Sequence, residues 1–231
     1  MGVAGESVLA LLTRAPASGG KTRLFAALGV PPDPALLTAL LLDTLDNARA
    51  AGVTVVVAVT PPSACDAVRA WLGPGSGRAG VSLAPGEHLA VVAQPEGTIG
   101  DRMRDLFGTL LEQGASRVAL IGSDLPSITP ALVRSAFAAI ARDPAAVALG
   151  PASDGGYYLI AASRVPPLFE GIDWGSARVL EQTIAAAALA GVRVYLLEPL
   201  ADVDTPADLR AAALAPGAVR TRLWVRAHLT A

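Results

Sequence analysis

RVALIGSDLP, residues 117–126, is the stretch that decides the fold. Its apolar, partly β-branched run stops at Gly122, and Pro126 cannot continue a central strand because it has no backbone N–H to donate. A continuous apolar run that ends in a turn is typical of a buried parallel strand. Asp124 then lies just past the carboxyl end of that strand, where open α/β sheets bind ligands. Its carboxylate either holds a metal ion or a ligand hydroxyl, or it caps the turn before a helix that begins near Thr129.

Strand-like and helix-like runs alternate along the rest of the chain. Because this alternation is typical of a mostly parallel sheet with helices on both faces, the sequence predicts an α/β fold. We expect a Rossmann-like three-layer α/β/α arrangement around a mixed sheet of about seven strands, with residues 1–231 forming a single domain. The glycine-rich stretch 73–86 is expected to be an exposed loop. The expected strands are 8–12, 53–59, 89–93, 118–121, 145–149, 157–161 and 192–197, and the expected helices are 23–28, 34–51, 63–72, 101–113, 129–142, 176–190, 205–214 and 217–229.

The composition excludes several classes of function. With 18 basic and 20 acidic side chains, the net charge of −2 leaves no basic field for a nucleic acid and no polybasic membrane patch. No apolar run reaches the roughly 18 residues of a membrane span. Cys65 is the only cysteine, so an intramolecular disulfide is impossible, and the N-terminal stretch has no signal-peptide pattern. We therefore expect a cytoplasmic protein whose ligands are small molecules.

The segment APASGGKT, residues 15–22, fits a loosened P-loop pattern after a strand. Three features count against a P-loop NTPase or kinase. Alanine stands where the first glycine belongs, and Pro16 cannot donate a backbone N–H to phosphate. The helix after Lys21 is also short, because Gly29 and two prolines follow it.

The same loop is a candidate anion site whether or not it is a P-loop. Arg14, Lys21 and Arg23 surround a flexible Gly19-Gly20 pair beside a helix start. We therefore predict that phosphate groups bind here, and the alternative is a solvated surface loop. The predicted nucleotide- and phosphate-binding residues are Arg14, Gly20, Lys21, Thr22 and Arg23, together with Asp124.

Two more aspartates follow expected strands. Asp154 precedes Gly155 and Gly156, and paired glycines let a ligand or another piece of backbone approach closely, although a plain hairpin turn also uses Asp-Gly. Asp204 lies just before the Thr205 N-cap of an expected helix. Asp124 and Asp204 would supply the one or two carboxylates that Mg²⁺ requires if their strands lie near each other.

The last expected helix carries the apolar side chains of Leu223, Trp224 and Leu229. They would pack either on the core of the same chain or on a second copy, as a homodimer. We expect the first arrangement, because apolar helix stripes are usually buried internally.

Five segments, taken in order, resemble a bacterial family of small proteins with the glycosyltransferase-A (GT-A) fold. Its members are labelled glycosyltransferases or nucleotide-diphospho-sugar transferases. The resemblance covers nearly the whole chain and depends on the combination of segments. More distant relatives are phospholactate guanylyltransferases and the molybdenum-cofactor nucleotidyltransferases, although the former differ at the Asp-Gly-Gly segment. The segments are TRAPASGGKTRL (13–24), IGSDLP (121–126), GPASDGGYYLI (150–160), FEGIDWGSARVLEQT (169–183) and DVDTPADL (202–209).

This resemblance implies a nucleotide-diphospho-sugar transferase-like domain with one antiparallel strand and a nucleotide bound over its N-terminal half. It implies that Lys21 and Arg23 hold the nucleotide phosphates. It implies that Asp124 is the principal Mg²⁺ or Mn²⁺ ligand, in a Ser-Asp-Leu sequence where the family has Asp-x-Asp, and that Asp204 is a second ligand. The positions that match the acceptor or sugar side are Asp154, Gly155, Gly156 and Trp174.

Together these residues predict a metal-dependent transferase that uses a nucleotide donor and a small-molecule acceptor. It would move a sugar from a nucleotide-sugar, or join a nucleoside monophosphate to a phosphorylated acceptor and release pyrophosphate. In both reactions Lys21 and the metal at Asp124 would stabilise phosphate charge. Asp154 is the candidate base for the acceptor. The alternatives are a P-loop NTPase or kinase and a non-catalytic nucleotide-binding protein of the same fold.

Overall fold

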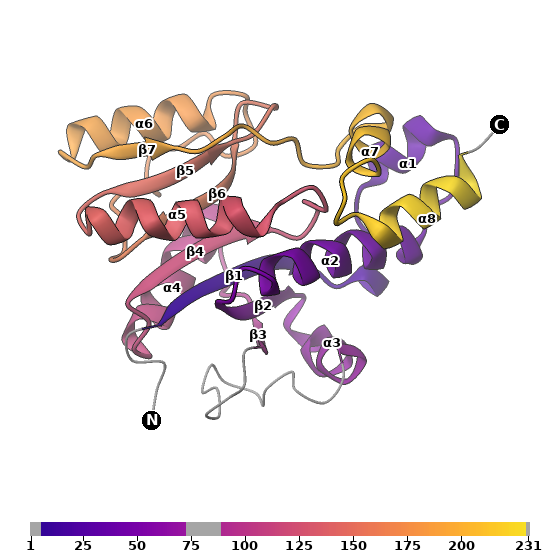
Figure 1. The fold of residues 1–231 in the computed structure, drawn as a ribbon, viewed down its shortest axis with the longest axis horizontal. Helices are drawn as coiled ribbons and strands as arrows, with labels where there is room; N and C mark the ends of the chain where they lie inside the picture. The colour runs from indigo at the N-terminus through magenta and orange to yellow at the C-terminus, as the bar shows by residue number, and fades with distance from the viewer. Residues whose placement is uncertain (1–5, 73–88, 230–231) are drawn as a thin grey trace.

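The computed structural model describes residues 6–72 and 89–229. Its centre is a seven-stranded sheet in the order β3-β2-β1-β4-β6-β5-β7 (Figure 1). Among these strands only β6 runs antiparallel to its neighbours, β4 and β5. The predicted α/β fold with a mostly parallel mixed sheet is therefore confirmed, and so is its one antiparallel strand. The strands are β1 (Ser7–Arg14), β2 (Thr54–Thr60), β3 (Leu89–Ala93), β4 (Arg117–Gly122), β5 (Val147–Pro151), β6 (Tyr157–Ala162) and β7 (Val194–Leu196).

Eight α-helices accompany the sheet in the described residues, at the places where the sequence predicts helices. The predicted loop at 73–86 lies outside the described residues. No helix of the described part of the chain is both long enough and apolar enough to cross a membrane. The helices are α1 (Thr22–Leu28), α2 (Pro34–Arg49), α3 (Cys65–Leu72), α4 (Ile99–Glu112), α5 (Pro130–Arg142), α6 (Val179–Leu189), α7 (Pro206–Ala212) and α8 (Val219–His228), with short 3₁₀ turns at Pro16–Ser18 and Pro62–Ala64.

Both faces of the sheet are covered, which explains why its strands read as continuous apolar runs. Along β2, Val55 and Val57 face one buried cluster and Val56 faces the other, since successive side chains of a strand point to opposite faces. The first cluster lies under α2, α3 and α5, and the second lies under α4 and α6. The sheet is therefore the middle layer of three, as the sequence predicts.

A third cluster lies beyond the end of the sheet, where α1, α7, α8 and the first half of α2 meet (Figure 1). Trp224 of α8 is buried there beside Leu36 and Leu40 of α2. The C-terminal helix thus packs on the core of its own chain, as expected. Leu223 is an exception, because its side chain is 60% exposed.

Two helix starts differ from the sequence predictions. Helix α4 begins at Ile99 rather than at 101, because Thr98 forms a capping box with Asp101. Gly100 therefore lies inside the helix, where a β-carbon would come within 2.5 Å of the indole nitrogen of Trp174. Helix α3 begins at Cys65 rather than at 63, because residues 62–64 form a 3₁₀ turn.

The strand order reverses between β1 and β4, because the chain first builds outward through β2 and β3 and then returns. In open α/β sheets such a reversal leaves a crevice outside the carboxyl ends of the two strands, and ligands bind there. Arg14 ends β1, and Ser123 and Asp124 directly follow β4. The fold therefore places the predicted basic loop and the predicted acid at the same crevice.

Candidate functional site

The chain after β7 returns across the carboxyl edge of the sheet. The backbone N–H of Leu200 donates to the carbonyl of Pro151 at the end of β5 (3.0 Å), and the N–H of Val203 donates to the carbonyl of Asp124 (3.2 Å). Val203 is fully buried in the third cluster. Because side chains alternate along an extended segment, Asp202 and Asp204 point the other way, toward Asp124.

Helix α2 holds the loop that carries Asp124. The Thr44 hydroxyl accepts a hydrogen bond from the backbone N–H of Leu125 (3.0 Å). Its single proton has two acceptors within reach, the carbonyl oxygens of Leu40 in the same helix (2.8 Å) and of Ser123 (3.2 Å). The side-chain amide of Asn47, also in α2, donates to the carbonyl of Pro126, the residue after Leu125 (3.0 Å). Thr44 is fully buried. The backbone on both sides of Asp124 is therefore fixed to a helix that packs in the core.

Three carboxylates meet at this point. Asp124, Asp202 and Asp204 each offer one oxygen, and these oxygens all lie within 4.8 Å of one another. The ammonium group of Lys21 reaches into the cluster, where its Nζ lies 2.6 Å from Asp204 Oδ1 and forms a second ion pair with Asp124. The structure thus brings together the loop lysine and the two acids that the sequence selected, although Lys21 is tied to carboxylates rather than open to phosphate.

The environment of Lys21 is unusual in two ways. Burial lowers its pKa, but attraction from Asp124 and Asp204 and hydrogen bonds to both outweigh burial and raise the pKa above its ordinary value. Its φ of +49° lies in the left-handed region, which L-residues avoid. Gly19 and Gly20 precede it with positive φ values as well. The loop is therefore bent sharply before α1, and two ion pairs hold its lysine in place.

Asp202 is the site residue that sequence reasoning missed. Burial, together with the negative charges of Asp124 and Asp204, raises its pKa to about 6, while Lys21 acts against them. A signal was present in the sequence, because Asp202 and Asp204 stand two residues apart on either side of an apolar valine. That spacing puts two acids on one side of an extended segment.

A cavity of about 710 Å³ opens beside the acids, and all six predicted nucleotide- and phosphate-binding residues line it. The side chain of Arg14 lies against Gly20, where a β-carbon would come 3.8 Å from its Cδ. Thr22 and Arg23 reach the cavity from the first turn of α1. The walls also include apolar side chains of α1 and α2, so the cavity combines a cationic rim with an apolar wall.

A second cavity, of about 650 Å³, lies on the β6 side of the acids and shares Arg23 and Asp204 with the first. The rings of Tyr157 and Trp174 line it in an edge-to-face arrangement, with centroids 6.4 Å apart. The Tyr157 hydroxyl contacts the sulfur of Met103 (3.9 Å). Burial raises the pKa of Tyr157 far above its ordinary value, so its hydroxyl stays neutral.

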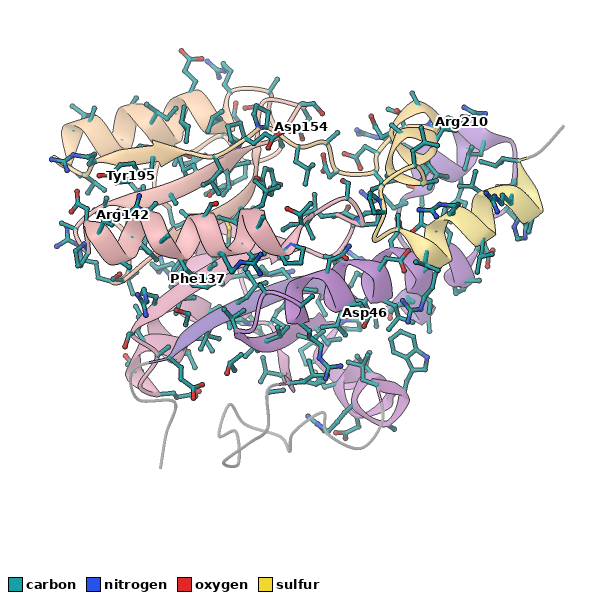
Figure 2. The ribbon with its side chains drawn as sticks, in the orientation of Figure 1. Asp46, Phe137, Arg142, Asp154, Tyr195 and Arg210 are labelled. Atoms are coloured by element: carbon teal, nitrogen blue, oxygen red, sulfur yellow. The ribbon has the colours of Figure 1, made fainter. Side chains whose placement is uncertain are left out.

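Asp154 lies at the tip of the β5–β6 hairpin, at the carboxyl edge of the sheet (Figure 2). Its side chain is exposed and accepts a hydrogen bond from the backbone N–H of Gly156 (2.8 Å), and both residues line the second cavity. Gly155 is placed differently. A β-carbon there would come 2.1 Å from the carbonyl oxygen of Ala177, so this glycine admits another piece of backbone rather than a ligand.

Comparison with known proteins gives one family match and two curated relatives. The model of a family described as "Uncharacterized protein conserved in bacteria (DUF2064)" matches residues 44–176. A 2-phospho-L-lactate guanylyltransferase of Natrialba magadii is 30% identical over 199 residues, which cover 82% of this chain and 76% of that protein. Its counterpart in Halorubrum lacusprofundi is 43% identical over 98 residues, which cover 42% of this chain and 43% of the relative, less than half its length.

Solved structures with the same fold include transferases. A Desulfovibrio desulfuricans protein, provisionally named a nucleotide-diphospho-sugar transferase, superimposes with a TM-score of 0.80 at 28% identity and 96% coverage of both chains. A nucleotidyl transferase from Methanothermobacter superimposes with a TM-score of 0.58 at 20% identity, over 93% of this chain and 97% of the other. At that lower identity the second likeness concerns the fold alone.

Proposed function

The chain belongs to the DUF2064 family, which is conserved in bacteria, and from that premise we propose that it is a nucleotidyltransferase, which transfers a nucleoside monophosphate from a nucleoside triphosphate to a small acceptor. An oxygen of the acceptor attacks the α-phosphorus, and the bond from that phosphorus to the oxygen bridging to the β-phosphorus breaks. Pyrophosphate then leaves. The observation that carries this proposal is the acidic cluster at the junction of a cationic cavity and an aromatic one.

The residues of the first cavity suit the donor. Arg14 and Arg23 would bind the phosphates of the nucleotide and stabilise the negative charge that grows on the leaving pyrophosphate. The backbone around Gly20 allows a phosphate to approach closely, because glycine has no side chain. The apolar wall formed by residues such as Leu37 would contact the nucleoside.

The three acids fit a divalent cation, Mg²⁺ or Mn²⁺. Their oxygens lie close together, and they already hold one cation, the ammonium of Lys21. Asp124, Asp202 and Asp204 would be the ligands, since hard cations prefer carboxylate oxygens. A bound divalent ion there supplies charge neutralisation on the phosphate oxygens.

The second cavity would hold the acceptor. Trp174 and Tyr157 offer apolar surface, and Asp154 offers an exposed carboxylate beside them. That carboxylate would orient an acceptor hydroxyl and take its proton, whereas an acceptor phosphate would need no base. Arg23, which lines both cavities, would contact an anionic acceptor as well as the donor.

The decisive experiment is a product assay with each of the four ribonucleoside triphosphates, Mg²⁺ or Mn²⁺, and a panel of small phosphorylated and hydroxylated acceptors. GTP and 2-phospho-L-lactate belong in the first round, because the two curated relatives carry the guanylyltransferase name. We expect release of pyrophosphate and a nucleotidylated product by mass spectrometry. Nucleotide binding without any product across the panel would instead support a non-catalytic nucleotide-binding protein.

Glycosyl transfer is the second candidate, favoured by the aromatic pair beside Asp154 and by the likeness to the Desulfovibrio protein. Thermal shift separates the candidates, because a ligand that binds the native state raises the melting temperature. A glycosyltransferase should respond to UDP- or GDP-sugars, and a nucleotidyltransferase to triphosphates. A P-loop kinase should respond to ATP alone, but α1 has only seven residues where a P-loop requires a substantial helix.

Asp124→Asn tests the acidic cluster directly. We expect it to abolish metal-dependent nucleotide binding while the fold is retained, because an amide is a far weaker ligand than a carboxylate for a hard cation. Calorimetry with Mg²⁺ and nucleotide measures the affinity, and circular dichroism checks the fold. Asp66→Asn, on the exposed surface of α3, is the matched control and should bind normally. Unchanged affinity in Asp124→Asn would contradict the metal role.

A further inference from the structure

We propose that Lys21 makes this site select the metal–nucleotide complex and reject the free divalent cation. The inference rests on the proposed function, because it assumes that the acids take a divalent ion. In the free protein the ammonium group of Lys21 stands at the cation position. The phosphates of an arriving nucleotide draw that ammonium away, and the acids then accept the metal that the nucleotide brings.

The position of the ammonium carries the first step. Lys21 Nζ lies 2.6 Å from Asp204 Oδ1 and also pairs with Asp124, and both acids belong to the candidate metal cluster. Mg²⁺ binds carboxylate oxygens at about 2.0–2.1 Å, so the ion and the ammonium would need the same small volume. Both are cations, and their mutual repulsion adds to the steric conflict.

The charges at the site favour the exchange of the Lys21 ammonium for a divalent cation. Three carboxylates face one ammonium, so the cluster holds its lysine firmly but is not neutralised by it. Lys21 is also only 17% exposed, which weakens the screening of these charges by water. Replacing a monovalent cation by a divalent one improves the balance, provided that the displaced ammonium finds another anion.

The loop before Lys21 allows the ammonium to leave. Gly19 is unpacked, since a β-carbon there would have no atom within 4 Å, and Gly20 meets only side-chain atoms, at 3.8 Å or more. The left-handed backbone of Lys21 is a disfavoured conformation that its two ion pairs help to hold. When these pairs are broken, the lysine can turn into the first cavity without disturbing the core.

The destination of the ammonium is the phosphate end of the first cavity, which Arg14, Lys21 and Arg23 all line. Within the described residues, neither arginine takes part in an ion pair. Phosphates bound by the two arginines would lie next to the ammonium and offer it the negative charge that it loses on leaving Asp124 and Asp204. Nucleotide and metal therefore bind cooperatively, whereas the metal alone competes with Lys21.

The test measures Mn²⁺ binding to the full-length protein by electron paramagnetic resonance, without turnover. We expect Lys21→Met to bind free Mn²⁺ roughly tenfold or more tightly than the unaltered protein, because it removes a positive charge within a few ångströms of the ion. Lys21→Arg keeps the charge and should bind free Mn²⁺ weakly. A non-hydrolysable GTP analogue should tighten Mn²⁺ binding strongly in the unaltered protein, and much less in Lys21→Met.

Two controls keep the result interpretable. Lys21→Gln is a second neutral variant, and thermal unfolding reports whether each variant is folded. Asp124→Asn added to Lys21→Met should remove the gain in Mn²⁺ affinity. If folded Lys21→Met and Lys21→Gln bind free Mn²⁺ no more tightly than the unaltered protein, the competition is disproved while the metal site stands. If no protein binds Mn²⁺ with or without the nucleotide analogue, the metal-dependent function fails together with this inference.

Discussion

Asp202 shares its surroundings with two other carboxylates and one ammonium group, so the site carries excess negative charge. Such an arrangement disfavours the folded state whenever all three acids are ionised, because like charges are held together. A protein tolerates this cost where the charge serves a ligand. At the scale of single residues, the proposed cation binding would therefore come at a cost in stability, and that cost can be measured at Asp202.

We expect Asp202 to lower the stability of the protein progressively as the pH rises from about 4 to about 6. The pKa of Asp202 is raised from 3.8 to about 6 in the folded state, so between these values the folded chain binds more protons than the unfolded chain. Stability falls with pH wherever that is so. Urea unfolding at several pH values measures the effect in the absence of metal.

Asp202→Asn removes the titrating group and is the matched variant. It should reduce the fall in the free energy of unfolding between pH 4 and pH 6. At pH 7 it should unfold at a higher temperature than the unaltered protein. A pH profile identical to that of the unaltered protein would show that Asp202 does not carry the effect. Asp173→Asn, at an exposed acid paired with Arg178, should leave the profile unchanged.

At the scale of elements, α2 organises the site through two side chains that face different partners. Thr44 binds the backbone around Asp124, and Asp43 receives the backbone N–H groups of Arg220 and Thr221 at the start of α8 (3.1 and 2.8 Å). Asp43 is fully buried and also pairs with the Arg220 guanidinium. One helix therefore positions the acidic loop and anchors the helix that completes the third cluster.

Thr44→Val tests the first role with a side chain of similar shape. The variant leaves the N–H of Leu125 buried without a partner, which costs about 1–3 kcal/mol of stability. We also expect it to weaken Mn²⁺ binding in the presence of nucleotide, because Asp124 loses its support. Thr44→Ser keeps the hydroxyl and should restore Mn²⁺ affinity even where stability is not fully restored. Weakened stability with unchanged Mn²⁺ affinity would limit Thr44 to a structural role.

Asp43→Asn tests the second role. The variant removes the charge that serves two backbone N–H groups and a guanidinium, and we expect a loss of about 2–4 kcal/mol in the free energy of unfolding. Asp46→Asn is the control, because Asp46 pairs with the same Arg220 at the surface, and this variant should cost less than about 1 kcal/mol. Guanidinium unfolding measures both, and equal losses would argue against Asp43 as the anchor.

At the scale of the whole molecule, the reversed direction of β6 determines how the two cavities meet. Because β6 is antiparallel, the β5–β6 hairpin with Asp154 and Tyr157 lies at the same edge as the ends of β1 and β4. The segment after β7 then closes the site, and its path is supported where the Tyr158 hydroxyl donates to the carbonyl of Glu198 (3.0 Å). The two cavities consequently share one acidic junction.

This arrangement predicts that the two cavities can be altered separately. Trp174→Leu should raise the KM for the acceptor by roughly fivefold or more, because it removes an aromatic contact worth about 1 kcal/mol. Nucleotide affinity should stay within about twofold, because Trp174 does not line the first cavity. Arg14→Ala should instead weaken nucleotide affinity and leave the KM for the acceptor little changed. Steady-state kinetics measure the KM for the acceptor, and titration measures the nucleotide affinity. If either variant changed both quantities equally, the idea of two separate cavities would be contradicted.

The sequence alone determined the elements of this protein and the strand ends that carry its acids. Runs such as residues 117–122 are apolar on both sides because both sheet faces are covered, and that local pattern is readable without coordinates. The basic loop and Asp124 could be selected for the same reason, since a turn after a buried strand marks the edge where ligands bind. Helix starts such as that of α4 were placed only to within two residues, because they depend on capping bonds.

Only the tertiary structure decided which charges meet. The ion pairs of Lys21 with Asp124 and Asp204 join residues far apart in the chain, and Asp202 joins them only because the segment after β7 crosses the sheet edge. Gly155, which the sequence assigned to the acceptor side, packs instead against the backbone at Ala177. The physical reason is that sequence periodicity reports how each element is buried, whereas the meeting of distant side chains depends on strand order and direction across the whole sheet.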